Sequence, residues 1–151
     1  MGSYNSFPLG VLSASFCDIV KISHLIMTDR FSNYMKLQVS AKMKIRPGML
    51  QGFKSQAAEC ISEVKRKDTG TLQYDWFISN DNTECEIRET YENSDALLAH
   101  VENLREPLRI LFEQFATDHS VVIYGNPSAQ LLENAKSRRI DFKIYSFLQA
   151  L

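Results

Sequence analysis

The sequence predicts an α+β fold with the element order βαββαβ, in which one antiparallel sheet carries helices on one face. Three observations support this prediction. Apolar and polar residues alternate over residues 35–45, a second alternation over 71–91 turns back on itself, and apolar residues at helical spacing flank that hairpin.

The first strand is predicted at residues 35–45, where every second residue is apolar. These residues are Met35, Leu37, Val39, Ala41, Met43 and Ile45. Such alternation is typical of a strand with one buried and one solvated face. Arg46-Pro47-Gly48 should end the strand.

A helix is expected next, because apolar residues recur on one helical face. These residues are Met49, Phe53, Ala57, Cys60, Ile61 and Val64. The basic segment Lys65-Arg66-Lys67 would lie in the last turn, where cations complement the helix dipole. The segment Asp68-Thr69-Gly70 should stop the helix.

A hairpin is predicted from Thr71 to Tyr91, with its turn at residues 79–83. Loops of two and of four residues give the same register. In that register Tyr74 lies opposite Glu89, Trp76 opposite Ile87, and Leu72 opposite Tyr91. Asp75 and Arg88 form an opposite-charge pair on the other face. One face of the hairpin therefore presents aromatic residues and a carboxylate, as a pocket for a small aromatic ligand would require.

The rest of the chain completes the predicted fold. Asn93 or Ser94 can cap a helix with Asp95 in its first turn, and Pro107 must break or kink the apolar stripe that follows. That stripe comprises Leu97, Val101, Leu104, Leu108, Leu111, Phe112 and Phe115. Residues 121–124 read as a buried strand. A helix with Pro127 at its first position and a short strand over 142–148 would form a C-terminal extension of this ferredoxin-like arrangement.

A sheet covered by helices on one face leaves the other face open, so a homodimer is expected. The residues predicted at or near the partner are Lys36, Gln38, Ser40, Asp75, Phe77, Glu86 and Arg88. Their mixed polarity predicts a hydrogen-bonded and partly hydrated interface.

Composition sets the remaining bounds. The chain of 151 residues is expected to hold an N-terminal extension at 1–34, with a short amphipathic stretch, and one domain at 35–151. A net charge of −1 gives no general attraction to nucleic acid or to an anionic membrane, and no segment is apolar for long enough to span a membrane. Neither nucleic acid nor a membrane is therefore expected as a partner.

Cysteine usage and motif spacing narrow the chemistry. Cys17, Cys60 and Cys85 are odd in number and lack a CxxC pair, which predicts buried or free thiols and a cytoplasmic location. No His, Cys, Asp and Glu spacing is typical of a metal site, and no phosphate-binding loop, dinucleotide fingerprint or nucleophile elbow occurs in the sequence. No metal ligand is therefore predicted.

The candidate site residues also have structural interpretations. His100 borders an apolar helix stripe, so it can be a packed, hydrogen-bonded histidine or a proton-transfer group. Glu89 falls on the predicted core side of its strand, where an unpaired carboxylate is rare; the alternative is a strand-end glutamate that reaches solvent. Tyr74 and Trp76 can serve packing alone.

Several segments together resemble the antibiotic-biosynthesis monooxygenase domain, in its quinol-monooxygenase-like branch. These segments are Ile45-Arg46-Pro47-Gly48, Gly70-Thr71-Leu72-Gln73-Tyr74-Asp75-Trp76, residues 89–96, Ala99-His100, and residues 122–128. The resemblance covers residues 35–148. It implies a dimeric α+β barrel in a family that includes cofactor-free oxygenases, haem-degrading enzymes and isomerases.

This chain departs from two patterns of that family. The haem-degrading branch expects an Asn on the first strand, where this sequence has Gln38 and Ser40. Many quinol-oxygenase-like members carry a second His where this chain has Leu104-Arg105-Glu106. The first departure disfavours haem degradation, and the second favours a module that binds a small molecule without catalysis.

The resemblance implies a cofactor-independent monooxygenase that acts on a quinol or hydroxylated aromatic with molecular oxygen. His100 would be the base, Tyr74 or Tyr91 a hydroxyl donor, and Glu89 would orient His100 or a tyrosine. Trp76, Tyr91 and Leu72 would contact the substrate. The alternatives are a non-catalytic dimeric binding module, or an isomerase or decarboxylase that uses the same pocket.

One geometric expectation joins these residues. Glu89 and His100 should line one cavity with Trp76 and with at least one of Tyr74 and Tyr91. Because a carboxylate would raise the pKa of His100 and burial would lower it, the sequence leaves the direction of that shift open.

Overall fold

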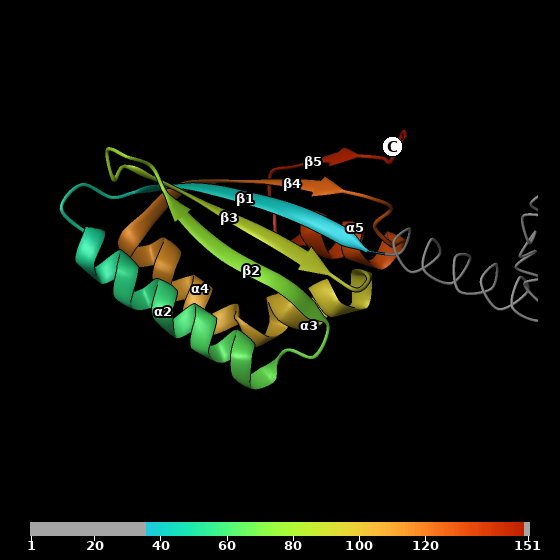
Figure 1. Ribbon diagram of the computed structural model, residues 1–151, viewed down its shortest axis with the longest axis horizontal. Helices are drawn as coiled ribbons and strands as arrows, with labels where there is room; N and C mark the ends of the chain where they lie inside the picture. The colour runs from blue at the N-terminus through green and yellow to red at the C-terminus, as the bar shows by residue number, and fades with distance from the viewer. Residues whose placement is uncertain (1–35, 150–151) are drawn as a thin grey trace, which may run out of the picture. The chain divides into compact units, whose positions relative to one another are not determined.

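Figure 1 shows a computed structural model of the chain, which describes residues 36–149. The expected extension at 1–34, with its amphipathic stretch and Cys17, lies outside the described residues. The elements are β1 (Leu37–Ile45), α2 (Leu50–Lys67), β2 (Thr71–Ile78), β3 (Glu84–Tyr91), α3 (Ser94–Asn103), α4 (Arg105–Ile110), η1 (Leu111–Phe115), β4 (Ala116–Tyr124), α5 (Ala129–Ser137) and β5 (Phe142–Tyr145).

The strands form one sheet in the order β2-β3-β1-β4-β5. β1 pairs antiparallel with β3 and with β4, β2 pairs antiparallel with β3, and β5 runs parallel to β4. The first four strands and their helices give the predicted ferredoxin-like α+β fold, and α5 and β5 follow as the predicted extension. In Figure 1 the helices gather on one side of the sheet.

β1 is the central strand, and its sequence alternation corresponds to its two faces. Leu37, Val39, Ala41, Met43 and Ile45 are all buried. Gln38, Lys42 and Lys44 are exposed on the opposite face, and Ser40 is buried there because its hydroxyl donates to Glu86 at 2.7 Å. Alternation thus identified both the strand and its core side.

The hairpin register is as predicted over most of its length. Tyr74 pairs with Glu89, Trp76 with Ile87, and Asp75 with Arg88. The predicted pairing of Leu72 with Tyr91 is wrong, because the register shifts between Thr71 and Gln73 and Thr71 takes that position. A bulge of this kind changes the direction of a side chain, and Leu72 is 49% exposed.

The helical segment after the hairpin is divided into three pieces. The Asn93 side chain accepts a hydrogen bond from the Ala96 N–H at 2.9 Å and caps α3. Pro107 has no N–H to donate to the carbonyl of Asn103, and α3 ends at that residue. The predicted break is therefore confirmed. The last piece, η1, is a π-helical turn that leads directly into β4.

The C-terminal part differs from the prediction in its boundaries. β4 begins at Ala116 rather than near Val121, because Thr117 and Ser120 also pair with β1 across a bulge. Pro127 does not start α5. The hydroxyl of Ser128 accepts from the Leu131 N–H at 3.2 Å and caps the helix.

Besides a small cluster of Cys60, Val64 and Leu104, two clusters of buried residues fill the space between the sheet and the helices. One joins Phe53 of α2 and Leu111 of η1 to β1 and β3. The other joins Leu97 of α3 and Leu131 of α5 to β1, β3 and β4. Cys60 and Cys85 are buried free thiols, as predicted. Among residues 36–149, no helix has the length and apolar character needed to cross a membrane.

Candidate active site

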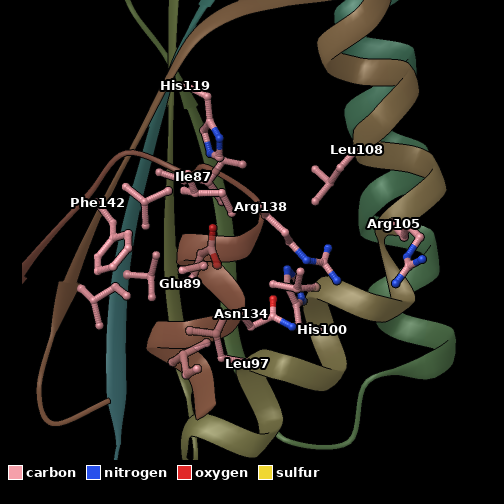
Figure 2. A pocket seen from close by; sticks show the side chains of 18 of the residues that line it. Ile87, Glu89, Leu97, His100, Arg105, Leu108, His119, Asn134, Arg138 and Phe142 are labelled. Carbon is pink, nitrogen blue, oxygen red and sulfur yellow. The ribbon is translucent and has the colours of Figure 1, made fainter. Parts of the chain in front are cut away.

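A cavity of about 270 Å³ lies between the helix-covered face of the sheet and helices α3, α4 and α5. Its walls are mainly aliphatic, with Val39, Ala41 and Ile87 from the sheet and Leu97, Leu108 and Leu131 from the helices. Figure 2 shows how side chains from these elements surround the same space. A volume near the lower end of the usual range for ligand pockets suits a small, largely apolar molecule.

Three polar side chains line this apolar cavity as predicted. They are Tyr74 on β2, Glu89 on β3 and His100 on α3. Figure 2 shows Glu89 and His100 projecting into the space from different elements. Glu89 is 7% exposed and His100 is 3% exposed, which rules out the interpretation of Glu89 as a strand-end residue in solvent.

His100 is hydrogen-bonded to Asp68 rather than to Glu89. Its Nδ1 lies 2.6 Å from Oδ2 of Asp68, the residue that ends α2. Asp68 also accepts from the Asn103 side-chain amide at 2.8 Å and from the Thr71 hydroxyl at 2.7 Å. The side chains of His100 and Asp68 are 4% and 3% exposed, so the bond is shielded from water.

Electrostatics assign a protonation state to this pair. Burial raises the pKa of Asp68, but the hydrogen bonds from Asn103, Thr71 and His100 together hold that pKa below its usual value. Burial lowers the pKa of His100, and the opposing effect of Asp68 does not reverse that shift. At neutral pH an ionised Asp68 thus faces a neutral imidazole. Since a carboxylate only accepts, the proton is assigned to Nδ1 and the lone pair to Nε2.

Glu89 is paired with Tyr91. The hydroxyl of Tyr91 donates a short hydrogen bond to Oε2 of Glu89. Burial raises the pKa of Glu89 to about 7, although the bond from Tyr91 opposes that shift. Glu89 is therefore a group in the cavity wall that titrates near neutral pH.

Aromatic rings hold His100 in place. The rings of Tyr74 and Tyr91 pack edge-on against the imidazole, with centroids at 4.9 and 5.1 Å. Burial raises the pKa of Tyr74 well above its usual value, so its phenol stays protonated. Tyr74, which lines the cavity, is thus neutral, and its ring lies against the neutral imidazole of His100.

Three predicted substrate contacts lie away from the cavity wall. Tyr91 is fully buried in the core, and Leu72 is turned outward by the bulge. Trp76 packs edge-on against Phe53 and Tyr74, with ring centroids at 6.0 and 5.6 Å. The expectation that Trp76 lines the cavity with Glu89 and His100 is therefore not met, because its ring fills space between the sheet and α2.

Asp68 and Asn103 were missed from the sequence, although two signals pointed to them. An acidic residue is unfavourable at the negative end of a helix, and Asp68 directly follows three basic residues at the end of α2. His100 and Asn103 are three residues apart on α3, so they lie on one face. Both side chains reach the same carboxylate.

The cavity rim adds polar residues that the sequence analysis did not select. Arg105 begins α4, Asn134 lies on α5, and Arg138 follows α5 directly; all three line the cavity.

Within residues 36–149, no cluster of three or more His, Cys, Asp and Glu side chains is arranged to hold a metal ion.

One known protein family matches the first part of this domain. The family model for antibiotic biosynthesis monooxygenase matches residues 37–105, which include Tyr74, Glu89 and His100. The match ends before η1, β4 and the C-terminal extension. A search of curated proteins found no significant match.

Solved structures share the fold at low sequence identity. MupZ from Pseudomonas fluorescens is 20% identical with a TM-score of 0.63, and the match covers 77% of this chain and 93% of MupZ. A candidate antibiotic biosynthesis monooxygenase from Nitrosomonas europaea is 19% identical with a TM-score of 0.55, covering 61% and 90% of the two chains. A conserved protein from Methanosarcina mazei is 19% identical with a TM-score of 0.57, covering 64% and 98%.

Proposed function

Because residues 37–105 belong to the antibiotic biosynthesis monooxygenase family, we propose that this protein is a monooxygenase that oxidises a quinol or other hydroxylated aromatic without metal or flavin. The observation that carries the proposal is a neutral imidazole, held by a buried carboxylate, in the wall of an apolar cavity. The imidazole supplies the base, and the apolar cavity supplies the dry environment, that such chemistry requires.

His100 is the proposed base. Its Nε2 accepts the proton of a substrate hydroxyl, while Asp68 holds Nδ1–H and stabilises the imidazolium that forms. Tyr74 is the proposed donor to the resulting oxyanion, since the hydroxyl of Tyr91 is already bonded to Glu89. Glu89 orients Tyr91 and, with its raised pKa, can carry a proton within the cavity.

The reaction balances without an added reductant. A benzene-1,4-diol and O₂ give a hydroxybenzoquinone and water: the substrate loses four electrons, one oxygen atom forms the new C–O bond, and the other leaves as water. Removal of the first proton produces an electron-rich anion that can reduce O₂ directly. The protein contributes the proton transfers and the position of the anion.

We further propose that the protein acts as a cytoplasmic homodimer. The face of the sheet opposite the helices carries Phe77, which is 55% exposed, and Tyr124, which is 38% exposed. A second sheet packed there would cover both side chains. The buried free thiols of Cys60 and Cys85 support a reducing compartment.

A second candidate function is a dimeric module that binds an aromatic molecule without turning it over. The observation that favours it is the junction of α3 and α4 at Leu104, which holds no second histidine and is fully buried. An isomerase or decarboxylase would use the same base without consuming oxygen.

An oxygen electrode with product analysis tests these functions together. The purified protein, without added metal or flavin, should consume oxygen with a hydroquinone faster than buffer does. His100→Ala should reduce that excess by about 10²- to 10⁴-fold, the usual contribution of a general base. An unchanged rate would remove His100 from the mechanism. Bound substrate recovered intact under air would favour the binding module, and turnover without oxygen uptake would favour an isomerase or decarboxylase.

A further inference from the structure

We propose that the substrate carries a carboxylate, and that Arg138 binds this group at the mouth of the cavity with help from Arg105. The proposal rests on the proposed function for the location of the ligand and adds its chemical class. Both arginines line the cavity that His100, Glu89 and Tyr74 line. Figure 2 shows the Arg138 side chain extending from the end of α5 toward the part of the cavity where His100 lies.

The charges at this part of the rim do not balance. Oε2 of Glu102 accepts from Arg105 at 2.6 Å and from Arg138 at 3.4 Å. Within the part of the chain that the structure describes, Glu102 is the only ion-pair partner of either guanidinium. Two positive groups therefore share one carboxylate, which leaves these three side chains with a net charge of +1.

The third arginine of the rim shows the opposite balance. Arg109 pairs with Glu106, at 2.6 Å, and also with Glu113. One guanidinium there faces two carboxylates and has no capacity to attract a further anion. The excess positive charge is therefore confined to the side of the rim where Arg105 and Arg138 lie.

The geometry leaves Arg138 able to receive a ligand. Its bond to Glu102 is longer than the usual range for N–H···O bonds, so the present partner holds it loosely. A guanidinium offers five N–H donors, and its paired donors match the two oxygens of a carboxylate. Asn134 lies one helical turn before Arg138, lines the same cavity and adds an amide donor.

The lower exposure of its side chain makes Arg138 the principal anchor. Its side chain is 31% exposed, against 65% for Arg105. A charge-assisted bond from a partly shielded group is worth more than one in open solvent. An aromatic acid with its ring in the apolar cavity would place a hydroxyl near His100 and its carboxylate at Arg138.

A purely structural role for Arg138 makes a different prediction. If the bridge to Glu102 only ties α5 to α3, loss of either partner should weaken the binding of every ligand alike. If Arg138 binds a ligand carboxylate, Glu102 competes with that ligand. Glu102→Gln should then strengthen the binding of an acid, while Arg138→Gln weakens it. The opposite signs separate the two roles.

The test uses 2,5-dihydroxybenzoic acid and its neutral amide, with binding measured by calorimetry under anaerobic conditions on the full chain. The acid should bind more tightly than the amide. Arg138→Gln should weaken binding of the acid by on the order of tenfold and leave the amide unchanged. Arg105→Gln should have a smaller effect in the same direction. Arg139→Gln removes the same charge one residue away, outside the cavity lining, and should leave both affinities unchanged.

Equal affinities for acid and amide would overturn the proposal, as would failure of the acid to bind, or a loss of acid binding in Glu102→Gln. Near-UV circular dichroism of each variant checks its folding. Because binding is measured without oxygen, the result is independent of turnover. Selective binding of the acid without oxygen uptake in air would retain the carboxylate site and reject the monooxygenase activity. Oxidation of the acid and the amide with equal kcat/KM would retain the monooxygenase activity and reject the carboxylate site.

Discussion

Nδ1 of His100 lies 2.6 Å from Oδ2 of Asp68, a residue 32 positions earlier in the chain, and both side chains are nearly inaccessible to water. This bond joins the C-terminal end of α2 to the last turn of α3. It also determines which nitrogen of His100 can accept a proton. Packing of two helices is thereby coupled to the chemical state of the cavity wall.

Asp68→Asn tests the role of that carboxylate as a positioning group. Asp68 raises the pKa of His100, so the variant should show a still lower pKa for this histidine by NMR titration. Loss of the enforced tautomer should lower kcat/KM by up to about 10⁴-fold, as at other histidine bases oriented by a buried carboxylate. Glu63→Gln removes a partly exposed acid of α2 that pairs with Arg66 and Lys67; it is the matched control and should change neither value. An unaltered pH profile in Asp68→Asn would argue for a structural role alone.

Glu89→Gln should change how stability depends on pH. The carboxyl of Glu89 has a folded-state pKa of about 7 and an ordinary value of 4.5. Below pH 4.5 both states bind the proton and Glu89 costs nothing. Between pH 4.5 and 7 the unfolded state releases this proton while the buried carboxyl keeps it, so the wild type loses roughly 3 kcal/mol relative to the variant, and the loss is complete above pH 7. Urea unfolding at pH 4.5 and pH 8 measures the difference.

The control for that experiment lies on the other face of β3. Glu86 has a lowered pKa, chiefly because Ser40 donates to it, so Glu86→Gln should not stabilise the protein at pH 8. A Glu89→Gln variant with the same stability difference from wild type at both pH values would contradict the assigned shift.

The open face of the sheet should form a homodimer interface. Multi-angle light scattering at micromolar concentration should report twice the mass of the chain. Phe77→Glu places a charge on this face and should shift the mass toward the monomer. Met49→Glu alters a residue that is 45% exposed just before α2, away from that face, and should remain dimeric. A monomeric wild type would exclude the dimer.

Gly52→Ala should destabilise the fold despite the better helix propensity of alanine. A Cβ at Gly52 would lie 2.4 Å from the ring of Phe115, so α2 and η1 would have to move apart. Overpacking of this kind costs about 1–3 kcal/mol, against a gain of about 1 kcal/mol from propensity. Chemical denaturation measures the net loss, with Lys54→Ala on the exposed side of α2 as the control. A more stable Gly52→Ala would show that Phe115 can give way.

Period-2 alternation predicted β1 and most of the hairpin register correctly, because side-chain direction in a strand depends only on local geometry. It failed at Leu72, where a bulge adds one residue and reverses the direction of the side chain. It also predicted β4 too short, because residues 117–120 are polar and the strand pairs with β1 across a second bulge. Bulges depend on backbone conformation that the alternation does not encode.

The sequence likewise predicted the site residues that depend on local geometry and missed those that depend on long-range packing. Glu89, His100 and Tyr74 were brought together by strand register and helix periodicity, which are local properties. Asp68 was not, because its position depends on how the end of α2 packs against α3, a long-range relation. Trp76 was placed on the correct face of β2, but the position of α2 assigns it to the core rather than to the cavity.

The two sides of the cavity come from separate stretches of the chain. The proposed base and its supporting groups lie within residues 37–105, whereas Leu131, Asn134 and Arg138 come from α5 and the residue after it. The first stretch can keep its hydrogen-bonded pair unchanged while the second is replaced. A graft of residues 126–149 from a protein of this fold should therefore alter ligand preference and leave the proton-transfer step intact. Reactivity and ligand selectivity could then change independently in evolution.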